Sequence, residues 1–154
     1  MPSDSDIVAR MAAILDSDRM AGSVDAARID ATEAALGVRF PHSYRLFLLN
    51  FGAGPCRHYE IFGIDPNPDE VDGSSVHIDV LQMNRDFRGV VADPPLPASF
   101  LNISDDGGDF EFFLDTARPT SDRECPVVAI GPSGEANVIA DSFVRFLELS
   151  DSET

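Results

Sequence analysis

Residues 100–115, FLNISDDGGDFEFFLD, contain two strand-like segments on either side of a turn. The segments are Phe100–Ser104 and Asp109–Asp115, and the tetrapeptide Asp-Asp-Gly-Gly at 105–108 separates them. Such a tetrapeptide is typical of a hairpin turn, because Asp accepts hydrogen bonds from nearby backbone amides and Gly adopts positive φ. Side chains alternate between the two faces of a strand, so three apolar residues of the second segment would share one face. These are Phe110, Phe112 and Leu114.

Further strands are predicted around this hairpin. Tyr59–Ile64 is rich in aromatic and β-branched residues, and Val127–Ile130 and Ala136–Ile139 flank a Pro-Ser-Gly turn. Between Tyr59–Ile64 and the hairpin, Val76–Phe87 is ambiguous, and its apolar spacing suits a short helix. Each of these strands is short and bounded by turn residues. The sheet is therefore expected to be mainly antiparallel.

Helices are predicted before and after these strands. Apolar residues recur with helical spacing in Asp6–Leu15, Asp25–Leu36, Pro41–Phe51 and Asp141–Leu149. Strands in the middle with helices at both ends favour an α+β fold over alternating βαβ units. We expect one domain, 1–154, in which N-terminal helices and a C-terminal helix pack on the sheet. Its core would span about 24–149, and 1–23 would be an N-terminal helix and link.

Composition restricts the function. The 154 residues hold 27 Asp plus Glu against 11 Arg and no Lys, a formal net charge of −16. Such a surface repels phosphate, so neither nucleic acid nor an anionic membrane is an expected partner. The acidic N-terminus, with no long apolar run after it, predicts a cytoplasmic protein. Cys56 and Cys125 are expected to be reduced thiols.

The charge is concentrated in two segments. Residues 60–86 carry a net −6 and residues 102–124 a net −5, whereas 23–51 is neutral. One interpretation is a solubilising surface. The other is a docking face for a basic partner, because complementary charge speeds association. For the second interpretation, the candidate partner-binding residues are Asp65, Asp69, Glu70, Asp72 and Asp79.

The sequence gives little support for a catalytic site or a metal site. Asp105, Asp106 and Asp109 offer the oxygen ligands that Ca²⁺ and Mg²⁺ prefer, but they lack the spacing of an EF-hand and also suit a plain hairpin turn. Cys56 and His58 are close enough for a thiol enzyme, yet no base or oxyanion helix is evident. We therefore predict no cofactor, no metal and no enzymatic activity.

Four blocks of the sequence, in order, resemble the SUKH superfamily. The first runs from Ile29–Leu36 through Gly37 and Phe40-Pro41 to Tyr44, and the second is Phe47–Gly52, ending in an Asn-x-Gly corner. The third is Ile103–Asp115, and the fourth is the closing helix Ser142–Leu149. The blocks together cover about residues 24–149.

This resemblance implies a binding protein without a catalytic motif. The superfamily groups fungal cell-wall assembly regulators of the Smi/Knr type with bacterial proteins that resemble immunity proteins against polymorphic toxins, often nucleases. The resemblance therefore favours an immunity protein that binds a basic cognate toxin. A regulatory or scaffold protein of cell-wall or signalling machinery is the alternative. The chain departs from the usual pattern in having no Trp.

Overall fold

The computed structural model describes residues 2–57, 59–66, 79–88 and 96–152. The described helices are α1 (Asp4–Ala12), the 3₁₀ helix η1 (Ser17–Arg19), α2 (Ala26–Leu36), α3 (His42–Asn50), α4 (Val80–Arg88) and α5 (Phe143–Ser152). The strands are β1 (Gly54–Cys56), β2 (Tyr59–Ile61), β3 (Phe100–Asp105), β4 (Glu111–Asp115), β5 (Val127–Ile130) and β6 (Ala136–Ala140).

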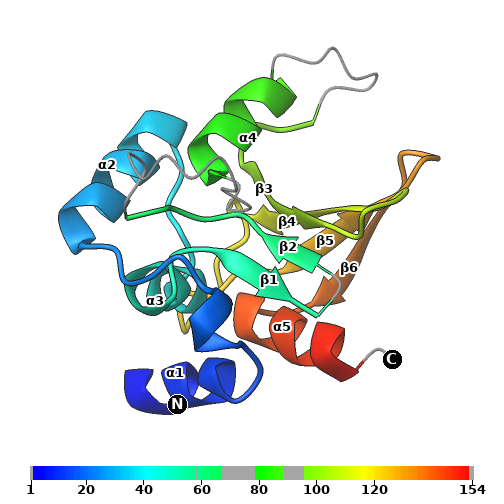
Figure 1. Ribbon diagram of the computed structural model, residues 1–154. Coiled ribbons are helices and arrows are strands. Elements are labelled where there is room, and N and C mark those ends of the chain that lie inside the picture. The colour runs from blue at the N-terminus through cyan, green and yellow to red at the C-terminus, as the bar shows by residue number, and fades with distance from the viewer. Residues whose placement is uncertain (1, 58, 67–78, 89–95, 153–154) are drawn as a thin grey trace.

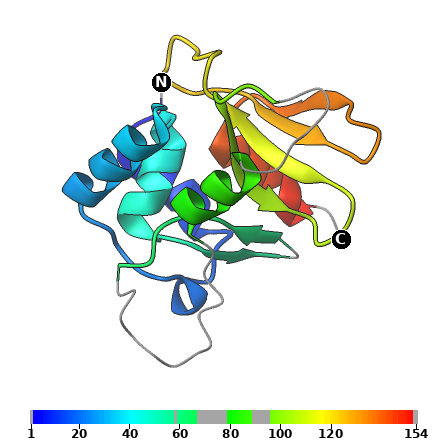
Figure 2. The ribbon, with the colours of Figure 1, turned by 90° about the horizontal axis from the view of Figure 1, so that it is seen from above.

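The strands form one antiparallel sheet in the order β1-β2-β3-β4-β5-β6, so each strand pairs with its neighbour in sequence (Figure 1). Helix α5 packs against β1 and β6, and α1 and α3 contact α5. Helix α4 packs against β3 and α2. Seen from above, α1, α2 and α3 gather at one end of the sheet, and the hairpins β3–β4 and β5–β6 extend at the other (Figure 2). The predicted α+β fold is confirmed.

Aromatic side chains of α3 and α5 form the centre of the core. Tyr44, Phe47 and Phe143 are fully buried. The ring centroids of Tyr44 and Phe143 lie 5.0 Å apart, and those of Phe47 and Phe143 lie 5.3 Å apart. The Tyr44 hydroxyl donates to the carbonyl of Phe62 at 2.7 Å, so its polar atom is satisfied inside the core. These contacts explain why the aromatic spacing of 41–51 and 141–149 is helical.

Two buried amides attach α4 to a bulge in β3. The register between β3 and β4 shifts between Asn102 and Ser104. The Asn102 side chain donates to the carbonyls of Ser104 (3.2 Å) and Phe112 (3.0 Å). Asn84 of α4 accepts from the Asn102 backbone amide at 2.7 Å and donates to its carbonyl at 2.9 Å. The polar backbone groups at this bulge are thereby paired within the fold.

The Asn-x-Gly corner after α3 is a place where two backbone segments almost touch. Gly52 has φ +78°, and its carbonyl accepts from the amide of Ile64 at 2.9 Å. A Cβ added at Gly63 would lie 1.8 Å from the Gly52 carbonyl oxygen. The corner therefore needs glycine on both sides, because no side chain fits between the segments.

Four local predictions are corrected by the structure. Helix α1 begins at Asp4, two residues before the predicted start at Asp6, because Ser3 caps it in a capping box with Asp6. Strand β1 was not predicted, since Gly54-Pro55-Cys56 lacks strand-forming residues. Pro41 precedes α3 as its N-cap rather than lying in its first turn. On α2, the buried face includes the polar residue Thr32 beside Ile29 and Leu36, which the spacing of apolar residues did not indicate.

Candidate docking surface

The predicted acidic docking residues lie only partly within the described chain. Asp69, Glu70 and Asp72 fall outside the described residues. Asp65 is half-buried after β2, and Asp79 is exposed at the start of α4, where its carboxylate accepts from the Gln82 amide at 3.1 Å. Helix capping by Asp79 was not foreseen in the sequence.

A backbone bridge draws the two ends of this acidic segment together. Gly63 and Asp79 form a parallel β-bridge, and the Val80 amide donates to the Gly63 carbonyl at 2.8 Å. Asp65, two residues after Gly63, therefore lies near Asp79. The bridge places the chain segments that contain the first and last of the five candidate residues side by side.

The β3–β4 turn is built by its own acidic side chains. The Asp105 carboxylate accepts from the Gly107 amide at 2.9 Å. The Asp106 carboxylate accepts from Gly108 (2.9 Å) and Phe110 (3.2 Å). The predicted hairpin is confirmed, with positive φ at Gly107 (+75°) and not at Gly108. In the described part of the chain, no group of three His, Cys, Asp or Glu is placed to hold a metal ion.

A groove lies between this hairpin and the C-terminal half of α5. It has a volume of about 320 Å³. Three of the four aromatic rings that line it contact one another: the Tyr59 and Phe112 centroids are 5.2 Å apart, and those of Phe112 and Phe146 are 5.1 Å apart. Its lining residues come from four strands, α5 and the β3–β4 turn: Tyr59, Asp106, Phe110, Phe112, Ala129, Ile139, Phe146, Leu149 and Ser150. We call this the hairpin groove.

Two large apolar side chains in the hairpin groove are exposed. Phe110 is 42 % exposed and Ile139 is 39 % exposed. Phe110 packs over Gly131, where an added Cβ would come within 2.7 Å of its ring. Ile139 is the extra residue at a register shift, because Val127 pairs with Ala140 and Val128 with Val138. The predicted strand 136–139 did not show this shift, since it depends on pairing with β5.

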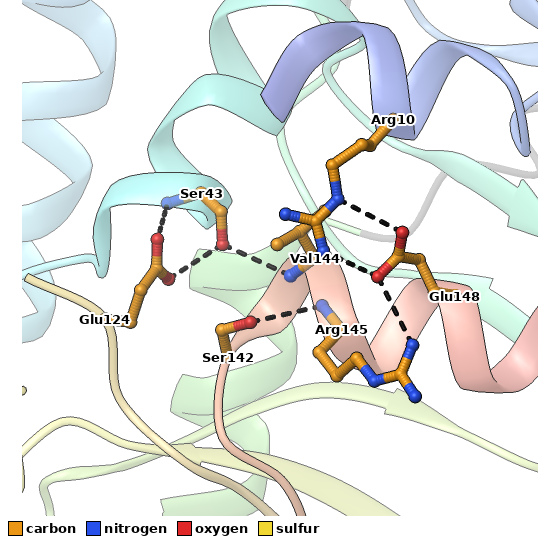
Figure 3. A network of polar contacts seen from close by, with 7 residues as sticks. All are labelled: Arg10, Ser43, Glu124, Ser142, Val144, Arg145 and Glu148. Carbon is orange, nitrogen blue, oxygen red and sulfur yellow. Dashed lines mark hydrogen bonds and ion pairs between the residues drawn. The ribbon is translucent and has the colours of Figure 1, made fainter. Parts of the chain in front are cut away.

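A polar network on the helical side joins α3 to α5 (Figure 3). The backbone amide and hydroxyl of Ser43 donate to the buried Glu124 carboxylate, at 3.0 and 2.8 Å. The Ser43 hydroxyl in turn accepts from the Val144 amide at 3.2 Å. Because Pro41 offers no side-chain cap, Glu124 supplies one from a loop 81 residues away. Burial raises the pKa of Glu124.

The same region contains a charged pair between α1 and α5, also drawn in Figure 3. Arg10 donates to Glu148 through two nitrogens, at 2.6 and 3.1 Å, and Arg145 lies 3.6 Å from the same carboxylate. Hydrogen bonding between the two side chains lowers the pKa of Glu148 and raises the pKa of Arg10. These contacts hold α1 and α5 together.

Ion pairs link residues of the helices to one another. Arg45 pairs with Asp30 at 2.7 Å and with Glu33 at 2.9 Å, and His42 lies 2.7 Å from Asp4. Within the described chain, Asp105, Asp106 and Asp109 have no ion pair. Acidic groups of the hairpin thus retain charge that no neighbouring arginine neutralises.

A second cavity, of about 390 Å³, lies beside the start of α3. Arg39, Arg45 and Arg123 line it, together with Glu33 and Glu124. Arg45 is already paired with Glu33 and Asp30. The lining of this cavity is therefore of mixed charge.

Cys56 and Cys125 are both buried, and no disulfide joins them. Burial raises the pKa of the Cys125 thiol to about 12, which disfavours the thiolate that a nucleophile needs. The Cys56 sulfur lies 3.4 Å from the Ser150 hydroxyl, and His58 is outside the described residues. Among the described helices, none has the length and apolar character to cross a membrane.

Comparison with known proteins identifies the family. The SMI1/KNR4 family (SUKH-1) matches residues 23–149, which include α2, α3, the described strands and most of α5. No curated protein matches the chain. The match spans well over half of the sequence and agrees with the four blocks that suggested it. The chain belongs to the SMI1/KNR4 family (SUKH-1).

Proposed function

We propose that this protein is a non-enzymatic immunity protein that binds and neutralises a cognate toxin. Membership of the SMI1/KNR4 family supports a role as an immunity protein or a cell-wall regulator. The observation that carries the proposal is a difference in charge pairing: Asp30, Glu33 and Glu148 of the helices are paired with arginine, whereas Asp105, Asp106 and Asp109 of the β3–β4 turn have no ion pair within the described chain. Unpaired acids repel one another, so their concentration favours a use in binding.

The proposed partner is basic. A nuclease toxin needs positive charge to hold phosphates, and such a surface is attracted to exposed carboxylates. Neutralisation requires only that the bound protein cover the toxin's active site, so no catalytic residue is needed. The acidic segment with Asp65, Asp69, Glu70, Asp72 and Asp79 and the hairpin acids are both proposed to contribute to this attraction.

Co-expression tests the proposal. Toxin domains encoded next to the gene for this chain would be expressed from an inducible promoter, with and without the chain. We expect one of them to stop growth alone and to be tolerated when the chain is present, with a complex recovered by gel filtration. If no neighbouring domain is toxic, or if toxicity persists without a complex, the immunity proposal is wrong. A partner from cell-wall machinery recovered instead would favour the regulatory alternative.

A further inference from the structure

The hairpin groove combines three features of a binding site. Phe110 and Ile139 leave a large part of their apolar surface in solvent at its mouth. Its interior is lined by rings that are already packed together, so the shape is formed before any partner arrives. Its volume of about 320 Å³ is at the lower end for small-ligand pockets. One large apolar side chain is a suitable occupant.

The acidic residues at the edge of the groove favour an occupant with positive charge. Asp106 lines the groove, and Asp105 and Asp109 belong to the same turn. One carboxylate oxygen of Asp105 and one of Asp106 accept hydrogen bonds from backbone amides of the turn. None of the three acids has an ion pair within the described chain. An apolar group flanked by positive charges complements this edge.

A second copy of the chain is a poorer occupant. Each copy carries a formal net charge of −16, so two copies repel each other. The groove would then bring two acidic turns together without any arginine on the described hairpin to pair with them.

We propose that the hairpin groove receives a single apolar side chain from a partner protein, presented on a segment with Lys or Arg on both sides. This proposal rests on the proposed function for the identity of that partner. Ile139 and Phe110 contact the apolar side chain, and the acids of the β3–β4 turn attract its basic neighbours. Such a central apolar anchor within a polar rim is the arrangement that concentrates binding energy in protein interfaces.

The absence of Trp from the chain permits a direct assay. The probe is the peptide Arg-Arg-Gly-Trp-Gly-Arg-Arg, whose indole is the only Trp fluorophore in the mixture. We expect a saturable blue shift of its emission on titration with the wild-type protein. Competition would use unlabelled peptides with Leu or Ser in the central position, and one with Glu in place of every Arg. The Leu peptide should displace the probe at least tenfold better than either of the other two.

Two adjacent residues of β6 provide matched variants. Val138 and Ile139 are both exposed, but Val138 pairs with Val128 and does not line the groove. Ile139→Asp should weaken peptide binding at least tenfold, and Val138→Asp should change it less than twofold, with both variants folded by circular dichroism. Asp109→Lys should weaken binding several-fold and reduce its salt dependence. Asp141→Lys, at the opposite end of α5, should not.

Three results would overturn the groove proposal. They are no saturable binding of the Trp peptide, equal losses in the two β6 variants, and displacement by the Ser peptide as good as by the Leu peptide. Sedimentation of the wild type adds a fourth, because a dimer that Ile139→Asp dissociates would make the groove a self-interface. Peptide binding with the predicted profile but no rescue from a toxin would refute the immunity function and leave the groove proposal standing.

Discussion

The helical side of this molecule (α1, α3 and α5) and its hairpin side (the β3–β4 hairpin) differ in how their charged and apolar side chains are placed. Around α1, α3 and α5, carboxylates are bound: Glu124 to Ser43, and Glu148 to Arg10. At the β3–β4 hairpin, the Asp105 and Asp106 carboxylates accept hydrogen bonds from backbone amides of their own turn. One apolar residue of each side shows the same difference, since Phe47 is fully buried and Phe110 is 42 % exposed.

This difference separates residues that maintain the fold from residues available to a partner. On the helical side, Glu124 and Glu148 are bound by groups of other elements, so their removal should cost stability. On the hairpin side, exposed acids and apolar groups contribute little to folding. Variants of the two sides should therefore differ in whether they alter unfolding or binding.

The largest expected effect is the loss of a core ring. Phe47→Ala and Phe146→Ala should each lower the free energy of unfolding by roughly 3–5 kcal/mol, because both rings are almost fully buried. Phe110→Ala should lower it by no more than about 1 kcal/mol. Urea denaturation followed by circular dichroism measures all three. Similar losses at Phe47 and Phe110 would remove the distinction between the two sides.

The hairpin turn gives the next effect. Gly107 has φ +75° and Gly108 does not, although both lie in the Asp-Asp-Gly-Gly turn. Gly107→Val should cost about 1–2 kcal/mol, since a β-branched residue resists the left-handed region. A Cβ at Gly108 meets its nearest neighbour at 3.5 Å, an ordinary contact, so Gly108→Val should cost less. Thermal melts compare them, and a larger loss at Gly108 would contradict the turn geometry.

The two buried or paired glutamates should give opposite and smaller pH effects. The raised pKa of Glu124 means that the folded state binds more protons, so its contribution favours folding at low pH and diminishes as pH rises through the folded pKa. The lowered pKa of Glu148 stabilises the fold above the unfolded pKa of about 4.5 and is lost as pH falls through the folded pKa.

Urea denaturation between pH 4 and pH 7.5 checks this pair of signs. As pH rises, Glu124 should make the wild type less stable, so Glu124→Gln should lose stability less steeply than the wild type. Glu148 should make the wild type more stable over the same rise, so Glu148→Gln should gain stability less steeply. Parallel pH profiles for the two variants would show that burial and ion pairing do not act separately.

The smallest effect on folding is expected in the acidic segment. Reversal to Lys at Asp69, Glu70 or Asp72 should leave the melting temperature unchanged, slow association with a basic toxin and flatten its salt dependence. Asp141→Lys is the matched control, with the same change of charge. Stopped-flow rates across a salt series measure both. If the control slows association equally, net charge alone is responsible.

The sequence was most informative where local pattern and tertiary packing agree. The spacing of Tyr44, Phe47, Leu48 and Phe51 predicted a buried helical face, and all four are buried in α3 or directly after it. The Asp-Gly turn predicted the β3–β4 hairpin because its residues hydrogen-bond locally. Such features depend on neighbours a few positions away.

Features that depend on distant partners were not predicted. Glu124 caps a helix 81 residues earlier in the chain. The position of Ile139 in the hairpin groove follows from a register shift against β5. The groove itself combines residues from β2, β4, β6 and α5, and no spacing within one segment indicates that they meet.

Amide hydrogen exchange of the chain, with and without the toxin domain recovered by co-expression, tests the central claim most directly. Binding should slow exchange in 105–115, in β6 and in the C-terminal half of α5, and should leave α1 and α2 unchanged. Slowed exchange confined to α1 and α2, with none around the hairpin groove, would contradict the assignment of the hairpin side as the docking surface.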